Sequence, residues 1–287
     1  MKKKALILVL ILVIFFGFYF LFPDLIYKQG LKAYEKKDYI SAEKYFNYAK
    51  FFKPKSIKIL IPLGISLYQQ EKYDDALNVF NQAKKLGSKD FALYYYLGKI
   101  YYLKGDIDKA IKEFSYAVNL NNNSYLPMKA LSSSFWYKKN YLMSLFWAEK
   151  ALKLNSKDFE TWNLLGISSL KLGFYDKALN AFNKAIELNN DYCNGYNNKA
   201  EVLFKMKNIK EAEQIIEKAI EIGTKTNDKR CVLYAYTTKG EILESQKKIK
   251  EALDSYQKAL SFQDFNWKDQ QAINFLQTKV NNLKSKL

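Results

Sequence analysis

Two short stretches of the sequence contain residue types that bind phosphate or metal ions in other proteins. Gly98 and Lys99 form the Gly-Lys pair of a phosphate-binding loop, but the GxxxxGK[ST] spacing is absent and the surrounding pattern is helical. Asp106 and Asp108 form an Asp-x-Asp pair, but no Gly and Glu follow at the spacing of a calcium loop. We therefore expect the two aspartates in a turn and at a helix start, and neither stretch predicts a phosphate or metal site.

The composition lacks the residue on which most catalytic and metal sites rely. The chain contains no histidine, which removes Ser-His and Cys-His catalysis and most zinc sites. Its two cysteines, Cys193 and Cys231, form no CxxC motif. A disulfide framework is thereby excluded, and a single bridge between the two is left open. We expect no metal ion, no cofactor and no enzymatic activity.

The charge balance is strongly basic, with 46 basic and 29 acidic residues and a net charge of +17. All basic residues except Arg230 are lysines. Sequence-specific recognition of bases and phosphates favours the planar fork of arginine. A diffuse excess of lysine is more typical of a solvated surface or of loose attraction to anionic polymers, so the composition argues against a nucleic-acid partner.

The N-terminal segment has the pattern of a membrane anchor. Residues 1–4 are a basic tail, and residues 5–22 are an apolar run without a charge, at the short end for a transmembrane helix. A cleaved signal peptide is an alternative, although the run ends in bulky residues. A buried helix is another, although the run has no polar face. The lysines of the tail favour a cytoplasmic N-terminus, while Lys28 and Lys32 reduce this asymmetry. The sequence predicts a single-pass membrane protein whose remaining chain lies outside the cytoplasm.

A fixed period governs most of the chain. Gly98, Ala110, Phe114 and Ala117 recur at a step of 34 residues. One step back gives Gly64, Ala76, Phe80 and Ala83, and two steps forward give Gly166, Ala178, Phe182 and Ala185. A last set that starts at Gly240 is offset by six further residues. The step defines seven units, 23–56, 57–90, 91–124, 125–158, 159–192, 193–226 and 233–266.

This pattern resembles the tetratricopeptide repeat (TPR), a 34-residue helix hairpin. The family has Leu-Gly at positions 7 and 8, Ala at 20, an aromatic residue at 24 and Ala at 27. The fifth unit shows it in full, with Leu165, Gly166, Ala178, Phe182 and Ala185. The resemblance covers residues 23–266 and implies an all-α fold, a right-handed superhelical solenoid of about seven helix pairs.

The same pattern indicates how the helices pack. Gly at position 8 and Ala at position 20 allow two helices of one unit to approach closely, and we expect the aromatic residue at 24 to face the next unit. Gly105 and Gly173 suit the ends of helices. Residues 267–287 predict an amphipathic capping helix. Its apolar residues, expected to face the array, are Ala272, Phe275, Leu276, Val280 and Leu283.

Two regions depart from the repeat. In the fourth unit Ser132 replaces the glycine, Ser144 the first alanine and Ala148 the aromatic residue. Compensated packing and a hinge are the two explanations. The insert 227–232 predicts either a lengthened helix or a loop at the edge of the groove.

The resemblance also implies a concave groove lined by positions 2, 5, 9, 12 and 13 of each unit. Aromatic side chains recur at positions 5 and 12 in the N-terminal half, which suits apolar or extended peptides. Further along, the positions become more polar. Packing within the helices is the alternative explanation for the tyrosines. The candidate groove residues are Tyr27, Tyr34, Tyr68, Tyr95, Lys99, Tyr102, Trp136, Asn163, Asn197 and Phe204.

Two functions follow from these features. The first is a membrane-anchored scaffold that binds proteins or peptides through its groove. The second is a surface or polymer binder that uses its lysines on anionic lipid, wall polymer or nucleic acid, and whose binding is strongly salt-dependent. Repeats, anchor and cap together leave no room for a catalytic domain.

Overall fold

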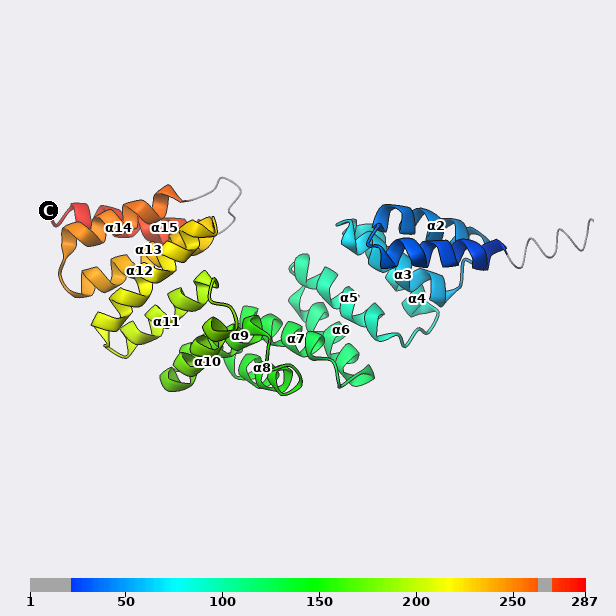
Figure 1. Cartoon of the computed structure of the whole chain (residues 1–287), viewed down its shortest axis with the longest axis horizontal. Helices are drawn as coiled ribbons and strands as arrows, with labels where there is room; N and C mark the ends of the chain where they lie inside the picture. The colour runs from blue at the N-terminus through cyan, green and yellow to red at the C-terminus, as the bar shows by residue number, and fades with distance from the viewer. Residues whose placement is uncertain (1–21, 263–269) are drawn as a thin grey trace, which may run out of the picture. The chain divides into compact units, whose positions relative to one another are not determined.

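A computed structural model describes residues 22–262 and 270–287, and every regular element in this part of the chain is an α-helix (Figure 1). The first helix covers residues 22–35. The helices that follow are α2 (Tyr39–Phe52), α3 (Ile57–Gln69), α4 (Tyr73–Lys85), α5 (Phe91–Leu103), α6 (Ile107–Leu120), α7 (Tyr125–Tyr137), α8 (Tyr141–Leu154), α9 (Phe159–Lys171), α10 (Tyr175–Leu188), α11 (Cys193–Lys205), α12 (Ile209–Lys225), α13 (Lys229–Ser245), α14 (Ile249–Ser261) and α15 (Gln270–Lys284).

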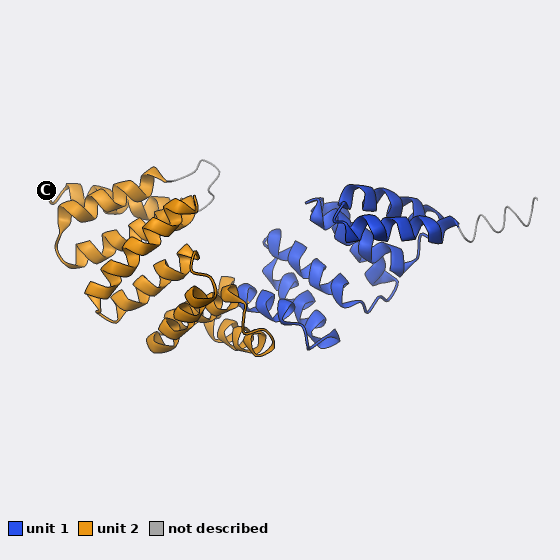
Figure 2. Cartoon of the chain, viewed as in Figure 1, with its two compact units in different colours: residues 1–134 blue, residues 135–287 orange. Residues whose placement is uncertain are grey.

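The chain divides into two compact units, Met1–Ser134 and Phe135–Leu287 (Figure 2). In the first, α3 packs on α4 and α5 packs on α6, and in the second the pairs are α9 with α10, α11 with α12 and α13 with α14. The boundary falls within α7, in the irregular fourth repeat. Each unit is thus a series of helix hairpins, as the 34-residue step predicts.

A left-handed residue ends the first helix of every repeat. Position 15 has a positive φ in all seven, including Gly105 at 80° and Gly173 at 79°. The other five repeats place a non-glycine residue there. These are Lys37, Glu71, Lys139, Lys207 and Lys247. A left-handed residue lets the chain leave one helix and enter the next within a few residues, so the turn geometry is the same whether or not glycine supplies it.

The glycine at position 8 makes room for the aromatic residue at position 24 of the same repeat. A Cβ added to Gly64 would lie 2.5 Å from Cε1 of Phe80, and one added to Gly98 would lie 2.5 Å from Cδ1 of Phe114. Both rings are fully buried. The ring therefore packs against the glycine of its own hairpin. The expected contact with the next unit is also present in the second repeat, where the ring centroid of Phe80 lies 6.1 Å from that of Tyr96.

The fourth repeat replaces some apolar contacts by buried hydroxyl groups. Ser132 and Ser144 are fully buried. The Oγ atoms of Ser144 and Ser168 lie 2.7 Å apart and share a hydrogen bond. Since a buried hydroxyl costs free energy unless it is hydrogen-bonded, this pair satisfies two such groups at once.

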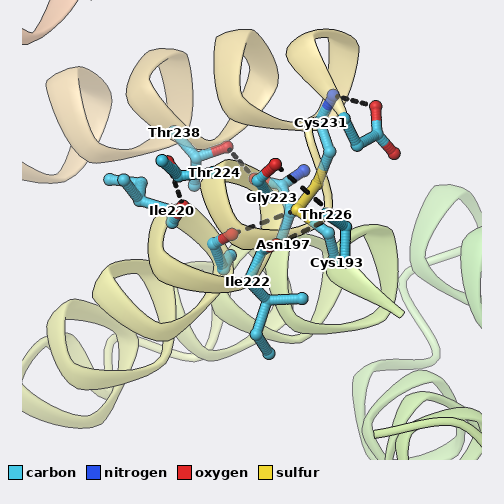
Figure 3. Close-up of a disulfide and its surroundings, with 11 residues drawn as sticks. Cys193, Asn197, Ile220, Ile222, Gly223, Thr224, Thr226, Cys231 and Thr238 are labelled. Carbon is cyan, nitrogen blue, oxygen red and sulfur yellow. Dashed lines mark hydrogen bonds between the residues drawn. A yellow bond between two sulfur atoms is a disulfide. The ribbon is translucent and has the colours of Figure 1, made fainter. Parts of the chain in front are cut away.

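The insert lengthens two helices and is fixed by a disulfide (Figure 3). α12 and α13 have 17 residues each, whereas α11 has 13. Cys193 at the start of α11 is bonded to Cys231 in the first turn of α13, with Cα atoms 6.2 Å apart. Both cysteines are buried. Gly223 of α12 lies against the bridge, since a Cβ there would be 2.8 Å from Sγ of Cys193. The bridge left open by the sequence is therefore formed.

Helix α15 covers the last hairpin through its apolar face. Leu276, Val280 and Leu283 are buried and cluster with Tyr256. Nζ of Lys279 is 2.7 Å from Oε2 of Glu244, which also accepts a hydrogen bond of 3.0 Å from Tyr256. Phe275 is 41% exposed, so its expected place against the array is wrong. It lies one residue before Leu276, and a step of one residue on a helix turns a side chain away from the buried face.

The expected membrane localisation is overturned. Residues 5–22, the expected span, lie outside the described residues except for Phe22. None of the helices that the structure does describe is long and apolar enough to cross a bilayer. A spanning helix needs about 20 predominantly apolar residues, and α12 and α13, with 17 residues each, carry several charges. The predicted localisation, a single-pass membrane protein with the array outside the cytoplasm, is therefore not retained.

Candidate functional site

Four of the candidate groove residues line one pocket in the first unit. Tyr68 of α3 and Tyr95, Lys99 and Tyr102 of α5 surround a cavity of about 240 Å³. Leu103, Phe114, Leu126, Lys129, Ala130 and Ser133 complete its lining. The pocket is therefore built from three consecutive first helices, α3, α5 and α7, with a floor from α6.

The positions of these side chains follow from the helical period. Tyr95, Lys99 and Tyr102 are spaced four and three residues apart, which places them on one face of α5. Buried Leu93, Leu97 and Ile100 hold the opposite faces of α5 against the core. The floor is set by Phe114, which is held in place against Gly98. The α5–α6 hairpin thus supplies one wall and the floor of the pocket.

Lys99 is the charged centre of the pocket. Its Nζ lies 4.7 Å from the ring centroid of Tyr68 and 5.6 Å from those of Tyr95 and Tyr96. Burial lowers the pKa of its ammonium, and no acidic group acts on it in the opposite direction. The rings attract the charge by their quadrupoles but do not neutralise it. Lys99 is therefore a half-buried cation without a carboxylate partner among the residues that the structure describes.

The tyrosines around Lys99 are held in their neutral form. Burial raises the pKa of Tyr95 to about 12, with smaller contributions from neighbouring tyrosines. Burial also raises the pKa of Tyr68 and of Tyr96. Neutral phenols beside a cation give the pocket an aromatic wall and a positive charge, an arrangement that suits an anionic group carried on an apolar body.

Comparisons with known families identify the fold. Tetratricopeptide repeat models match residues 61–124 and 191–264, and a model described as anaphase-promoting complex, cyclosome, subunit 3 matches residues 138–219. A tetratricopeptide repeat protein of Parabacteroides merdae has the same fold over 91% of this chain and 98% of its own, with a TM-score of 0.64 and 19% identity. The chain is a tetratricopeptide repeat protein.

Other solved TPR structures are similar to parts of the chain. YrrB, described as a TPR protein with an unusual peptide-binding site, is 22% identical, covers 66% of this chain and 96% of its own, and has a TM-score of 0.58. The APC/C hetero-tetramer Cut9–Hcn1 contains a chain that is 22% identical, covering 68% of this chain and 39% of its own, with a TM-score of 0.55. No curated protein matches this chain. At these identities the likeness shows the fold alone.

Two candidates in the first TPR hairpin lie apart from the pocket. Tyr27 is buried, with its ring centroid 5.8 Å from that of Phe46, and belongs to the core. Tyr34 is partly buried against the same core, and its ring is 5.8 Å from that of Tyr39. Tyr27 therefore has a packing role, and Tyr34 extends the aromatic surface beside the pocket.

The four candidates in the second unit form no common site. Asn197 is buried and accepts a hydrogen bond of 3.0 Å from Thr238, and Asn163 accepts one of 2.8 Å from Asn198. Phe204 packs on the cluster around α11 and α12. The indole nitrogen of Trp136 is buried and has no hydrogen-bond partner in the described part of the chain. Local structure accounts for both asparagines and for Phe204.

The sequence contained the signal for three lining residues that were not selected. Leu126, Lys129 and Ser133 occupy positions 2, 5 and 9 of the fourth repeat, which are groove positions in the TPR family. The fourth repeat departs from the pattern at its glycine, where Ser132 stands. The departure affects the packing of the hairpin and leaves the face of α7 that lines the pocket unchanged.

The Asp-x-Asp pair has a structural role. The Asp106 side chain accepts a hydrogen bond of 3.2 Å from the backbone N–H of Lys109 and caps the start of α6. The Lys109 ammonium is 2.6 Å from the other carboxylate oxygen, and its hydrogen bond lowers the pKa of Asp106. This carboxylate serves as a helix cap, as expected from the sequence.

Proposed function

We propose that this TPR protein is an interaction scaffold that binds segments of other proteins in the groove of its first unit. The observation that carries the proposal is the convergence of Tyr68, Tyr95, Lys99 and Tyr102 on one pocket of about 240 Å³. Pockets for whole small molecules measure about 300–1,000 Å³. The smaller volume, open along a groove, suits one or two side chains of an extended peptide.

The known structures support a protein partner. YrrB is described as having a peptide-binding site, and Cut9–Hcn1 is an assembly of protein chains. TPR proteins are typically scaffolds without catalytic activity, and we infer the same here. The second function weighed from the sequence, binding of polymers by the lysines, receives no support from these comparisons. The right-handed superhelix of about seven helix pairs stays a prediction.

A matched pair of double variants tests the proposal. Leu103 and Leu126 line the pocket and are 55% and 38% exposed, so replacing both with Gln changes the pocket without opening the core. Leu25 and Leu188 are 56% and 40% exposed and lie outside the pocket. The two double variants remove similar exposed apolar area.

The assay is selection of peptides from a random display library, followed by fluorescence anisotropy with the selected peptides. We expect the Leu103→Gln/Leu126→Gln variant to lose at least about tenfold in affinity, since it removes apolar contacts to the bound segment. The Leu25→Gln/Leu188→Gln variant should bind as the wild type does. Equal binding by both variants would show that the pocket is not the site.

A further inference from the structure

The pocket in the first unit has the chemistry to select its partner by charge as well as by shape. Its lining contains Lys99 and Lys129 and no Asp or Glu. The ammonium of Lys99 lies over the ring of Tyr68, half-buried, and no acid in the described part of the chain offsets its desolvation. An anionic group that enters the pocket would meet this ammonium and recover part of that cost.

The rest of the lining specifies what must accompany the anion. Tyr95, Tyr102, Leu103, Phe114 and Leu126 are apolar or aromatic and make up most of the wall. A bare inorganic anion would leave this surface uncovered. A cationic or quaternary ammonium ligand, which an aromatic wall alone would suit, is disfavoured because Lys99 occupies the centre.

The surroundings favour an internal segment of a partner over a chain end. The aromatic surface continues from the pocket through Tyr68 and Tyr96, whose rings lie 5.0 Å apart. It extends toward Tyr34, whose pKa is raised by burial and, to a smaller extent, by Tyr96. An extended peptide can therefore pass over the pocket and continue along the groove. A second copy of this chain is a poor occupant, because each copy carries a net charge of +17.

We propose that the Lys99 pocket binds an Asp or Glu side chain of an extended partner segment together with an apolar side chain next to it. The proposal rests on the function proposed above and adds the chemical class of the partner. The carboxylate pairs with the ammonium of Lys99, and the neighbouring apolar side chain covers Phe114 and Leu126. Apolar segments without an acid bind more weakly because Lys99 then stays desolvated and unpaired.

The experiment is a selection from two libraries of random ten-residue peptides. One library is capped at both ends, and the other has a free C-terminal carboxylate. We expect the capped library to yield peptides with Asp or Glu next to Leu, Ile or Phe. Replacing that acid with its amide should weaken binding about 10- to 100-fold, the range of one hydrogen bond to a charged group.

Variants of the protein complete a double-mutant cycle. Lys99→Gln should lower the affinity for the acidic peptide by the same factor. It should not lower the affinity for the amide form further, because both changes break the same pair between the ammonium and the peptide carboxylate. Lys99→Arg should keep most of the affinity. Lys112→Gln is the matched control, since Lys112 is an exposed lysine of the same unit outside the pocket. Circular dichroism and thermal unfolding verify that each variant is folded.

The outcomes separate this proposal from the function on which it rests. The acidic partner would be overturned if the selected peptides contained no acid. It would also be overturned if Lys99→Gln bound the peptides as the wild type does while Leu103→Gln/Leu126→Gln bound them more weakly. Either result would leave the groove as a peptide site. Selection only from the free-carboxylate library would replace the side chain by a chain end and overturn the proposal as stated. If neither library yielded a peptide and the protein instead bound polygalacturonate, an anionic polymer used as a probe, both the acidic partner and the peptide groove would be overturned.

Discussion

The ammonium nitrogen of Lys99 lies 4.7 Å from the ring centre of Tyr68, although the two residues come from different repeats. Tyr68 is in α3 and Lys99 in α5, and these helices pack on each other within the first unit. The stacking of first helices therefore creates the contact, and neither hairpin contains it alone. A groove built this way depends on hairpin geometry, which several variants can probe.

Alkaline pH should destabilise the first unit through Tyr95. The folded-state pKa of Tyr95 is about 12, against about 10 in an unfolded chain. Below pH 10 the phenol keeps its proton in both states. Between about pH 10 and 12 only the unfolded state loses it, so stability falls as pH rises. Between pH 9 and 11.5 the free energy of unfolding of Tyr95→Phe, measured with urea, should fall by about 1–2 kcal/mol less than that of the wild type.

Tyr48→Phe is the control for this titration, because the side chain of Tyr48 is exposed in α2. It should follow the pH dependence of the wild type. An unchanged pH dependence in Tyr95→Phe would mean that the phenol of Tyr95 is accessible to solvent and that the pocket wall is looser than described.

Gly98→Ala should destabilise the third hairpin despite the better helix propensity of alanine. The new Cβ would lie 2.5 Å from Cδ1 of Phe114. Overpacking of this kind lowers the free energy of unfolding by about 1–3 kcal/mol. The higher helix propensity of alanine raises it by at most about 1 kcal/mol. Denaturant unfolding should show a net loss, and Phe114→Leu in the same chain should reduce the penalty of the alanine. A penalty of the same size in both backgrounds would show that the ring is not the obstruction.

Lys207→Gly should stabilise the sixth hairpin. Lys207 has a φ of 61° in an exposed turn, a conformation that costs a side-chain-bearing residue about 1 kcal/mol relative to glycine. The reverse change, Gly105→Ala at a φ of 80°, meets no atom within 4 Å, so its loss should be purely conformational and of similar size, about 1 kcal/mol. Thermal unfolding measures both changes, and opposite shifts are expected. Shifts of the same sign would contradict the shared turn geometry.

Loss of the disulfide should weaken the second unit selectively. The bridge joins residues separated by 38 positions, and removing a cross-link of that length costs about 2–4 kcal/mol. Cys193→Ala/Cys231→Ala should therefore unfold at lower denaturant, and reductant should have no further effect on it. Reductant should lower the stability of the wild type toward that of the variant. Hydrogen exchange should locate the change in α11–α13, and a change in α3–α6 would contradict this account.

The periodic residues made most of the fold predictable. Gly98, Ala110 and Phe114 set the hairpin, and the 34-residue step carried the pattern from repeat to repeat. The contact of the aromatic ring with the glycine of its own hairpin was not predictable, because spacing shows which residues share a helix face but not which helices that face meets. The disulfide was not predictable either, because Cys193 and Cys231 approach only after the insert extends α12 and α13.

The site was predictable in part for the same reason. Groove positions in regular repeats led to Tyr68, Tyr95, Lys99 and Tyr102, which the structure places around one pocket. The same positions in the second unit led to Asn163 and Asn197, whose hydrogen bonds to Asn198 and Thr238 depend on three-dimensional neighbours. Periodicity assigns a face to each side chain, and contacts decide whether that side chain is available to a ligand.

Site-specific photo-cross-linking tests the central claim, that the pocket of the first unit receives a peptide. A benzophenone amino acid replaces Leu126, which lines the pocket and is 38% exposed, or Tyr45, which lies outside it and is 37% exposed. Each protein is irradiated with a selected peptide, and adducts are mapped by mass spectrometry. The account predicts an adduct from position 126 that excess unlabelled peptide suppresses, and none from position 45. Equal adducts from both positions, or an adduct only from position 45, would contradict it.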